Sequence, residues 1–508
     1  MTATVNYSSS YLNEELNRAF EAALTSARHG AVQPLPHLVN GVANATGTVF
    51  ERCDPAIPDN VVSAAHTASN DVIDAAVAAA RSAAREWRIR DYQDRIALLR
   101  SAKAEFTDRC IELAGIISAE TGKTRLESIA EAQEAVDLIE HYCVQLEKNQ
   151  GFVTPMDSQS DEINTDLLLP YGVFAVLAPF NFPVALAVNM TTAALVTGNT
   201  VVLKPSDKTP RSTSTAADIL ARNLPEGVLN LVHGGIPAGE ALVESAVDGI
   251  AFTGSAEVGW NLVRKQTKRS WTRPVLAEMG GQNPAIVTAF ADLDAAAEGI
   301  VRSAFGLSGQ KCSACRRVVV DRSVHDQLVS KLVERTAALV IGDSADARTH
   351  LGPVIDDAIT SRIDDALVTA ARDGNVRTGG RLTGYFFAPV IVTDLPLGHP
   401  LTRNELFGPF LTVTAVDGLD QAIEEANAVD YGLSAGIFTQ EADERQRFLN
   451  EIEAGIVYVN RREGATTGAW PGIQSFCGWK ASGSVGKGGL GPWYLPGFCR
   501  EQSRTVCA

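Results

Sequence analysis

Short apolar runs separated by helical stretches dominate the chain from about residue 170 onward. Four runs have the length and apolarity of buried strands: GVFAVLAP (172–179), TVVLKP (200–205), VLNLVHG (228–234) and GIAFTG (249–254). Helical patterns separate them near 184–195, 212–224 and 238–245. Strands that alternate with helices predict a parallel α/β sheet. Ligands bind beyond the carboxyl ends of the strands in such sheets, so we expect the chemistry in the loops that follow these runs.

The same alternation continues to residue 460 and predicts a second α/β domain. Its strand-like runs are PAIVTAF (284–290), RRVVVDR (316–322), APVIVTDL (388–395), FLTVTAV (410–416), GLSAGIFT (432–439) and GIVYVN (455–460). Helices are expected over 293–305, 324–340 and 419–426. No short internal repeat interrupts this pattern.

The first 170 residues follow a different pattern. Residues 1–67 are rich in turn formers with little periodicity, and we expect an arm or small strands on the surface of the first domain. A helical block follows from Ser69, which is placed to cap, and a third helix is expected over about 125–147. Residues 150–169 alternate and contain turn formers, which predicts a β-hairpin that leaves the main body.

Composition narrows the class of protein. The chain has 508 residues, a net charge of −16 and an isoelectric point near 5.0, which argues against nucleic-acid or anionic-membrane surfaces. Its 8 cysteines have no disulfide-framework spacing, which fits a reducing compartment. We find no signal peptide and no apolar run of membrane-spanning length, so we expect a cytoplasmic protein.

The stretch FGLSGQKCSACRR (305–317) carries the strongest candidate for chemistry. Cys312 follows a turn at Gly309, where a positive φ is expected, and Lys311 beside it is expected to lower the thiol pKa. The same residues fit a pair of buried small cysteines, Cys312 and Cys315, or a C-x-x-C redox or zinc motif. No second C-x-x-C or H-x-H pattern lies nearby, so no metal site is predicted.

Two other polar residues suit a thiol nucleophile. Asn181, in the loop APFNFP, could donate to an oxyanion. Glu278, in LAEMGGQNP, could serve as a general base that swings on the flexible glycines Gly280 and Gly281. Taken alone, each also fits an ordinary turn residue.

Three further loops suit a dinucleotide. Lys204 ends a strand and could reach a ribose or phosphate, and Asp207 could accept from ribose hydroxyls, which favours a cofactor without a 2′-phosphate. FTGSAEVG (252–259) is a strand–turn–helix junction whose Ser255 and helix start suit a pyrophosphate, although it is not a G-x-G-x-x-G fingerprint. Glu405 in NELFGP could hold a second ribose, with Phe407 packed against it.

Taken in order, these motifs resemble the NAD(P)-dependent aldehyde dehydrogenase superfamily over nearly the whole chain. The ordered set is ETGK (120–123), APFNFP, KPSD, FTGSAEVG, EMGGQNP, GQKCSAC and ELFGP. The resemblance implies Cys312 as nucleophile, Glu278 as base, and Asn181 with the Cys312 backbone N–H as oxyanion hole. It implies contacts with a cofactor, NAD or alternatively NADP, from Ala178, Pro179, Phe180, Lys204, Ser206, Asp207, Gly254, Ser255, Gly259, Glu405 and Phe407.

Within the superfamily, GQKCSAC, PFNFP and the tail from Gly468 resemble the 1-pyrroline-5-carboxylate (L-glutamate γ-semialdehyde) dehydrogenases. In that group a serine and a Thr-Gly-Ala loop hold the substrate carboxylate. The resemblance implies substrate contacts from Phe182, Lys311, Ser313, Gly468, Ala469 and Phe476. The tail departs from the group at Trp470-Pro471, Ser475 and Cys477, which leaves a different aldehyde open as substrate.

The resemblance also implies the domain plan and the reaction. We expect a Rossmann-type NAD-binding domain (1–149 and 170–278), an α/β catalytic domain (279–464), a β oligomerisation arm (150–169 and 486–508) and a substrate-anchoring loop (465–485). The implied reaction oxidises a small aldehyde to an acid through a cysteine thioester, in a homodimer or larger homo-oligomer. One alternative is a CoA-acylating enzyme, which Glu278 disfavours because such enzymes generally lack the glutamate base. The other is an inactive relative, which the presence of Cys312, Glu278 and Asn181 together disfavours.

Overall fold

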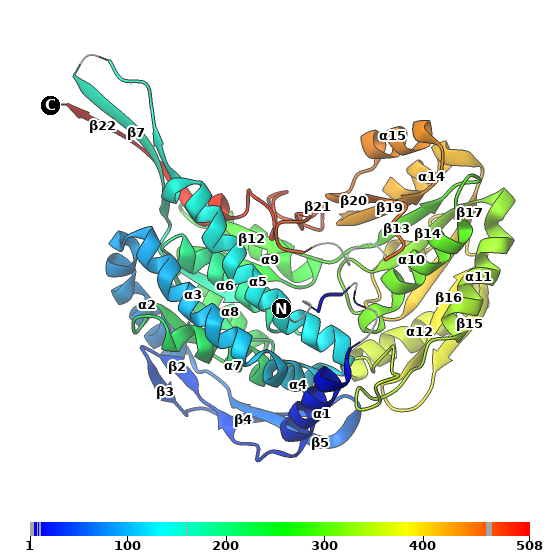
Figure 1. The fold of residues 1–508 in the computed structure, drawn as a ribbon, viewed down its shortest axis with the longest axis horizontal. Coiled ribbons are helices and arrows are strands. Elements are labelled where there is room, and N and C mark those ends of the chain that lie inside the picture. The colour runs from blue at the N-terminus through cyan, green and yellow to red at the C-terminus, as the bar shows by residue number, and fades with distance from the viewer. Residues whose placement is uncertain (1–4, 8, 10–11, 160, 464–469, 508) are drawn as a thin grey trace.

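The computed structural model describes residues 5–7, 9, 12–159, 161–463 and 470–507. Two seven-stranded sheets, each with helices on both faces, form the two halves of the molecule, and the chain segments of the site lie between them (Figure 1). None of the described helices is both long and apolar enough to cross a membrane.

The first sheet has the order β12-β11-β8-β9-β10-β2-β3. Its five parallel strands are β8 (Val173–Leu177), β9 (Thr200–Lys204), β10 (Leu229–Leu231), β11 (Gly249–Thr253) and β12 (Val275–Glu278). The short strands β2 (His37–Val39) and β3 (Val42–Asn44) extend one edge in the antiparallel sense. Side chains alternate across β8, so Phe174 packs in the core on one face and Val173 in the core on the other.

Helices cover both faces of this sheet. The face that Phe174 joins is covered by α3 (Tyr92–Asp108), α5 (Arg125–Lys148), α6 (Ala185–Val196) and α7 (Pro210–Arg222). The other is covered by α2 (Asn70–Ile89), α8 (Ile236–Glu244) and α9 (Ala256–Gln266). The start of α2 agrees with the sequence, because the Ser69 hydroxyl accepts from the Val72 N–H.

The second sheet has the order β15-β16-β17-β14-β13-β19-β20. Its strands are β13 (Asn283–Val287), β14 (Cys315–Asp321), β15 (Asn375–Arg381), β16 (Phe387–Thr393), β17 (Phe410–Val416), β19 (Ser434–Phe438) and β20 (Ile456–Val459). One face packs on α10 (Leu293–Phe305) and α11 (His325–Ala337), and the other on α14 (Gly418–Asn427) and α15 (Ala442–Glu451). Helix α12 (Asp357–Asp373) packs against β16, and α13 (Pro400–Arg403) is a single turn.

The N-terminal region contains a helix that was not expected, in addition to the predicted small strands. Helix α1 (Glu14–His29) packs closely on α4 (Cys110–Thr121), where Gly115 leaves no room for a Cβ against Ala23. The expected small strands are present as β1 (Pro34–Leu35), β4 (Val49–Asp54) and β5 (Ile57–His66), which form a three-stranded sheet. Strands β18 (Tyr431–Gly432) and β21 (Trp479–Lys480) pair as a separate two-stranded ribbon.

The arm leaves the main body as a long ribbon (Figure 1). It consists of β6 (Val153–Pro155), β7 (Glu162–Pro170) and β22 (Cys499–Cys507), in the order β22-β7-β6. The expected hairpin is thus present, but the second part of the arm begins at Cys499 and not at residue 486. Residues 490–498 instead pack in the first core through Leu490, Tyr494, Leu495 and Phe498.

Candidate active site

Cys312 lies in a tight loop between α10 and β14. Gly309 has the expected positive φ of 70°, and a Cβ there would overlap the Gly408 carbonyl. Asn283 fixes the other side of the loop, because its amide donates to the carbonyls of Cys312 (2.8 Å) and Ala314 (2.9 Å). The buried Arg316 guanidinium donates to the Lys311 carbonyl at 3.0 Å. These contacts hold the backbone of the loop 309–316, which is called the nucleophile loop after the predicted role of Cys312.

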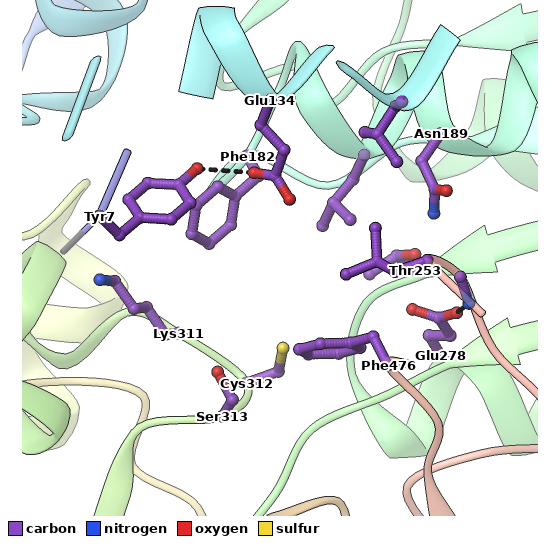
Figure 2. A pocket seen from close by; sticks show the side chains of 14 residues that line it. Tyr7, Glu134, Phe182, Asn189, Thr253, Glu278, Lys311, Cys312, Ser313 and Phe476 are labelled. Atoms are coloured by element: carbon purple, nitrogen blue, oxygen red, sulfur yellow. Dashed lines mark hydrogen bonds between the residues drawn. The ribbon is translucent and has the colours of Figure 1, made fainter. Parts of the chain in front are cut away.

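Cys312 and Glu278 line the same pocket (Figure 2). The predicted residues Phe182, Lys311, Ser313 and Phe476 line it as well. Its other described walls come from Tyr7, Glu134, Leu138, Leu186, Asn189, Thr253, Gly489 and Leu490. A thiol, a carboxylate and two aromatic rings at one small cavity form the arrangement that the motifs predicted. Gly468 and Ala469 lie outside the described residues.

The expected effect of Lys311 on the thiol is wrong. The Lys311 ammonium points away from Cys312, toward the Glu127 carboxylate at 3.7 Å and over the Tyr7 ring, 5.5 Å from its centroid. Burial is the main reason that the pKa of Cys312 is raised to about 12; the charges of Glu405 and Glu278 contribute to this rise, and the Ser313 N–H and the Arg316 charge oppose it. In this structure the thiol is therefore protonated at neutral pH.

Glu278 ends β12 with its carboxylate in the pocket. One carboxylate oxygen accepts from the Gly489 N–H at 2.8 Å. Burial raises the pKa of Glu278 to about 7, and the Gly489 hydrogen bond offsets part of that rise. A carboxyl group with this pKa exchanges protons near neutral pH, as a general base requires.

The two glycines after Glu278 allow other groups to approach the backbone closely. A Cβ on Gly280 would overlap the Glu405 carboxylate, and one on Gly281 would crowd the Cys312 carbonyl. The Gly281 N–H donates to Glu405 at 3.1 Å. Burial raises the pKa of Glu405, and the nearby Arg316 charge opposes this. Glu405 thus lies beside the nucleophile loop.

Asn181 faces the nucleophile loop as predicted for an oxyanion donor. Its Nδ2 donates to the Gln310 carbonyl at 2.9 Å, two residues before Cys312. The amide is buried and does not line the described pocket wall itself. Whether it binds an oxyanion stays a prediction.

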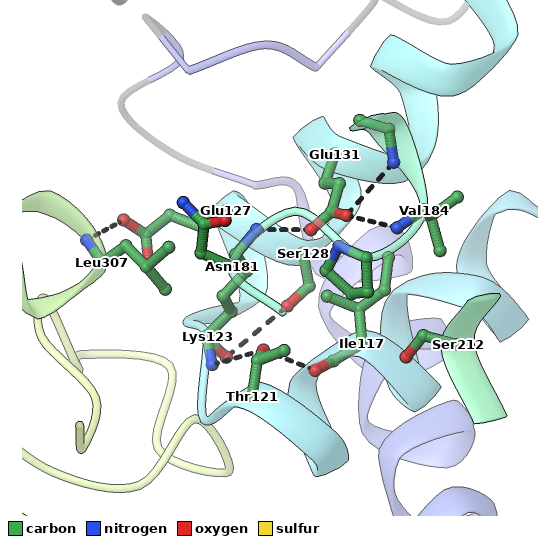
Figure 3. A network of polar contacts seen from close by, with 12 residues as sticks. Ile117, Thr121, Lys123, Glu127, Ser128, Glu131, Asn181, Val184, Ser212 and Leu307 are labelled. Atoms are coloured by element: carbon green, nitrogen blue, oxygen red, sulfur yellow. Dashed lines mark hydrogen bonds and ion pairs between the residues drawn. The ribbon is translucent and has the colours of Figure 1, made fainter. Parts of the chain in front are cut away.

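A buried ion pair supports the loop that carries Asn181 (Figure 3). The Lys123 ammonium bonds to the Glu131 carboxylate, and both side chains are fully buried. The second Glu131 oxygen accepts from the Val184 N–H at 2.8 Å, at the start of α6. The Lys123 ammonium also lies 3.7 Å from the centroid of the Phe182 ring, a cation–π contact. The ETGK motif therefore helps to position the loop 181–184, through Lys123 and its partner Glu131.

A second groove lies at the carboxyl ends of β8 and β9. Four of the predicted cofactor residues line it: Ala178, Lys204, Ser206 and Asp207. Its apolar wall comes from Leu177, Val243, Phe252, Val258 and Leu262. Lys204 is held in place, because its ammonium donates to the carbonyls of Pro205 (2.6 Å) and Gly234 (2.7 Å), and burial lowers its pKa to about 8.

The other predicted cofactor residues do not line the groove. Gly254 and Gly259 pack against Phe252 and Met279 with no room for a Cβ, and the Ser255 hydroxyl caps α9 through Val258. Phe180 and Phe407 stack edge to face at 5.9 Å, and Glu405 lies near the nucleophile. Pro179 precedes this aromatic pair and is buried. Their contacts with a cofactor stay predictions.

A family model described as the aldehyde dehydrogenase family matches residues 42–503. The chain belongs to the aldehyde dehydrogenase family. The resemblance drawn from the ordered motifs and the α/β fold class are both confirmed.

Within the aldehyde dehydrogenases, the chain is similar to several 1-pyrroline-5-carboxylate dehydrogenases. The chain is 35% identical over 503 residues to a 1-pyrroline-5-carboxylate dehydrogenase of Geobacillus sp. (strain WCH70), covering 97% of this chain and 96% of that one. It is 35% identical over 499 residues to 1-pyrroline-5-carboxylate dehydrogenase 2 of Bacillus subtilis (strain 168), covering 96% and 95%. A solved structure of the Thermus 1-pyrroline-5-carboxylate dehydrogenase with bound NAD superposes with a TM-score of 0.94 at 30% identity, covering 98% of each chain.

Several pocket residues of this aldehyde dehydrogenase carry no motif signal. Tyr7 lies in the region expected to form a surface arm, and Glu134 lies in a helical block interpreted as packing alone. Leu490 and Gly489 belong to the segment assigned to the arm. A signal for Glu134 does exist, because a buried face of α5 that contains a carboxylate requires a partner.

Proposed function

We propose that this enzyme oxidises L-glutamate γ-semialdehyde to L-glutamate with NAD as hydride acceptor. The observation that carries the proposal is a single pocket that holds a thiol (Cys312), a carboxylate with a pKa near 7 (Glu278) and a second carboxylate (Glu134). The first two groups suit aldehyde oxidation, and the third suits a substrate that carries an ammonium group. The similarity to 1-pyrroline-5-carboxylate dehydrogenases supports this choice of substrate.

The first half of the reaction forms a covalent intermediate on Cys312. Glu278 accepts the thiol proton, and the sulfur attacks the aldehyde carbon to give a thiohemiacetal. Asn181 and the Cys312 backbone N–H stabilise the oxyanion, with Gln310 orienting the amide of Asn181. Loss of hydride then leaves a thioester on Cys312.

The second half is hydrolysis of the thioester. Glu278 removes a proton from water, which attacks the thioester carbonyl and releases the acid and the thiol. Because its pKa is about 7, Glu278 can release the thiol proton to solvent before the second half, then accept the proton of the water and return it to the departing sulfur.

The second groove fits a dinucleotide. Helix α8 begins there without a side-chain cap, so a phosphate could accept from its first N–H groups, except at Pro237, which has none. Asp207 and Ser206 suit ribose hydroxyls, and the apolar wall suits a purine. A bound nicotinamide supplies the hydride acceptor. The Asp207 carboxylate would repel a 2′-phosphate, so we propose NAD over NADP.

The test is a panel of aldehydes assayed with NAD and with NADP by absorbance of the reduced nicotinamide. We expect the highest kcat/KM for glutamate γ-semialdehyde with NAD. A higher kcat/KM for succinate semialdehyde or an aliphatic or aromatic aldehyde would assign a different aldehyde, as the departure at Trp470-Pro471 leaves open. No reduction with any aldehyde would mark an inactive relative.

The arm suits an oligomer of this chain, and we propose that it joins two subunits. Strand β22 exposes nearly all of its residues, among them Val506, and Ile163 of β7 is exposed as well. A strand edge with exposed apolar residues is a ready site for pairing with a second copy.

A further inference from the structure

The N-terminal segment reaches into the substrate pocket. The Tyr7 hydroxyl donates to a Glu134 carboxylate oxygen at 2.7 Å, across 127 residues of sequence. Its ring meets Phe182 edge to face at 6.0 Å and Trp470 at 5.7 Å. In Figure 2 the second Glu134 oxygen points into the open pocket. Tyr7 therefore contacts a charged group, an aromatic wall and the tail of the chain at once.

Helix α5 holds both segments that close this side of the pocket. Glu134 bonds to Tyr7, and Asp137, one helical turn further on, accepts from the Trp470 indole N–H at 2.8 Å. The two aromatic rings then contact each other. Tyr7 of the N-terminal segment and Trp470 of the expected substrate-anchoring loop are thus both held by helix α5, side by side.

We propose that Tyr7 sets the selectivity for an aldehyde that carries an ammonium group, by holding the Glu134 carboxylate ionised and turned into the pocket. This inference rests on the proposed function. The chemistry follows from the donor set: the phenol O–H satisfies one carboxylate oxygen and leaves the other for the substrate ammonium. The Tyr7 ring, placed between Phe182 and Trp470, excludes water from that contact.

The charges around Glu134 make its state sensitive to the Tyr7 hydroxyl. Burial raises the pKa of Glu134 to about 7, and the Tyr7 hydrogen bond opposes the rise. Glu131 and Asp137 on α5 raise the pKa, and Lys123 lowers it. Lys311 and Glu278 line the same pocket from the nucleophile loop and from β12. Loss of the phenol O–H therefore leaves more of Glu134 neutral at pH 7.

The experiment compares two aldehydes that differ in the amino group alone. Glutamate γ-semialdehyde carries it, and glutarate semialdehyde has the same chain and carboxylate without it. Tyr7→Phe keeps the ring and removes the hydroxyl. We expect a KM for glutamate γ-semialdehyde raised roughly tenfold at neutral pH, the effect of one charge-assisted hydrogen bond, with kcat and both constants for glutarate semialdehyde little changed.

The pH profile separates this role from packing. In Tyr7→Phe the pKa of Glu134 rises, so the pH at which kcat/KM for glutamate γ-semialdehyde reaches half its maximum moves upward. The profile for glutarate semialdehyde depends on Glu278 and stays in place. Tyr92→Phe is the matched control, since that hydroxyl is on α3 and bonds to Gln93 at 3.5 Å.

Glu134→Gln provides the second variant, because it removes the charge and keeps Tyr7. Like Tyr7→Phe, the Glu134→Gln enzyme must lose its preference in KM for glutamate γ-semialdehyde over glutarate semialdehyde. Equal effects of Tyr7→Phe on both aldehydes, or wild-type selectivity in Glu134→Gln, would overturn the assignment. A wild-type enzyme that does not oxidise glutamate γ-semialdehyde would instead refute the proposed function, which distinguishes the two failures.

Discussion

Three titratable side chains of the pocket, Cys312, Glu278 and Glu134, have pKa values displaced toward their neutral forms by burial. The displaced values suit the two carboxyls to proton exchange near pH 7. For the Cys312 thiol, burial instead lowers reactivity, because it suppresses the thiolate until a base accepts the proton. Reactivity of this cysteine thus depends on its partners in the pocket and not on the adjacent Lys311.

Glu278→Gln removes the base and should slow turnover by roughly 10²–10⁴-fold. The first hydride transfer should slow as well, because the Cys312 thiol loses its proton acceptor, so the burst of reduced cofactor should be slower than in the wild type. In the wild type, turnover should fall as pH drops below about 7, because protonated Glu278 cannot accept a proton. Stopped-flow absorbance measures both phases. A variant without a burst but with normal steady-state turnover would contradict the role.

Cys312 should react slowly with iodoacetamide in the free enzyme. With a pKa of about 12, the alkylation rate should rise with pH and reach no plateau before the protein unfolds. Mass spectrometry of the peptide that contains Cys312 measures the rate, and Cys312→Ala, which should also abolish dehydrogenase activity while the cofactor still binds, gives the background. A plateau near neutral pH would show a thiolate that this structure does not hold.

Helices α2 and α5 were predicted from local residue patterns, whereas helices α1 and α15 were missed. Helix α5 begins at a capping box between Thr124 and Glu127, and the start of α2 is marked by Ser69. Helix α15 buries Phe448 alone among its ten residues, so it has almost no apolar period. Helix α1 was missed although it carries local signals: the Asn13 side chain caps its start, and Glu14 and Glu15 lie in its first turn.

Lys123→Met should destabilise the fold by about 3–5 kcal/mol, because it leaves the Glu131 charge buried without its partner. Denaturant unfolding measures the change. Lys331→Met removes one partner of the exposed Lys331–Asp294 pair and should cost about 0–1 kcal/mol. Adding Glu131→Gln to Lys123→Met should recover part of the loss. An equal effect of both single substitutions would refute the role of burial.

At the scale of the whole molecule, the site combines residues from both sheets and from distant parts of the chain. The ordered motifs predicted Cys312, Glu278 and the residues Phe182, Lys311, Ser313 and Phe476, all of which line one pocket. The pairing of Tyr7 with Glu134 could not be predicted, because the two residues are 127 positions apart in the sequence. The same holds for the direction of the Lys311 side chain, which Glu127 determines.

Removal of β22 should dissociate the oligomer that we propose for this chain. A chain that ends after Phe498 keeps the aromatic contacts of that residue in the first core and loses the nine residue pairs between β22 and β7, from Cys499 with Pro170 to Cys507 with Glu162. Sedimentation velocity should show a smaller species than the full chain, with secondary structure retained by circular dichroism. Val506→Asp on the same strand is a milder variant that should weaken association in the same direction.

The hydrogen bond between Glu278 and Gly489 has a consequence for biosynthesis. Its two partners are 211 residues apart. At a translation rate of roughly 5–20 residues per second, the ribosome makes the partner of the base roughly 10–40 s after the base itself. A nascent chain therefore carries the sulfur and the carboxylate well before the wall beside them exists, and it cannot turn over aldehyde while it is still being synthesised.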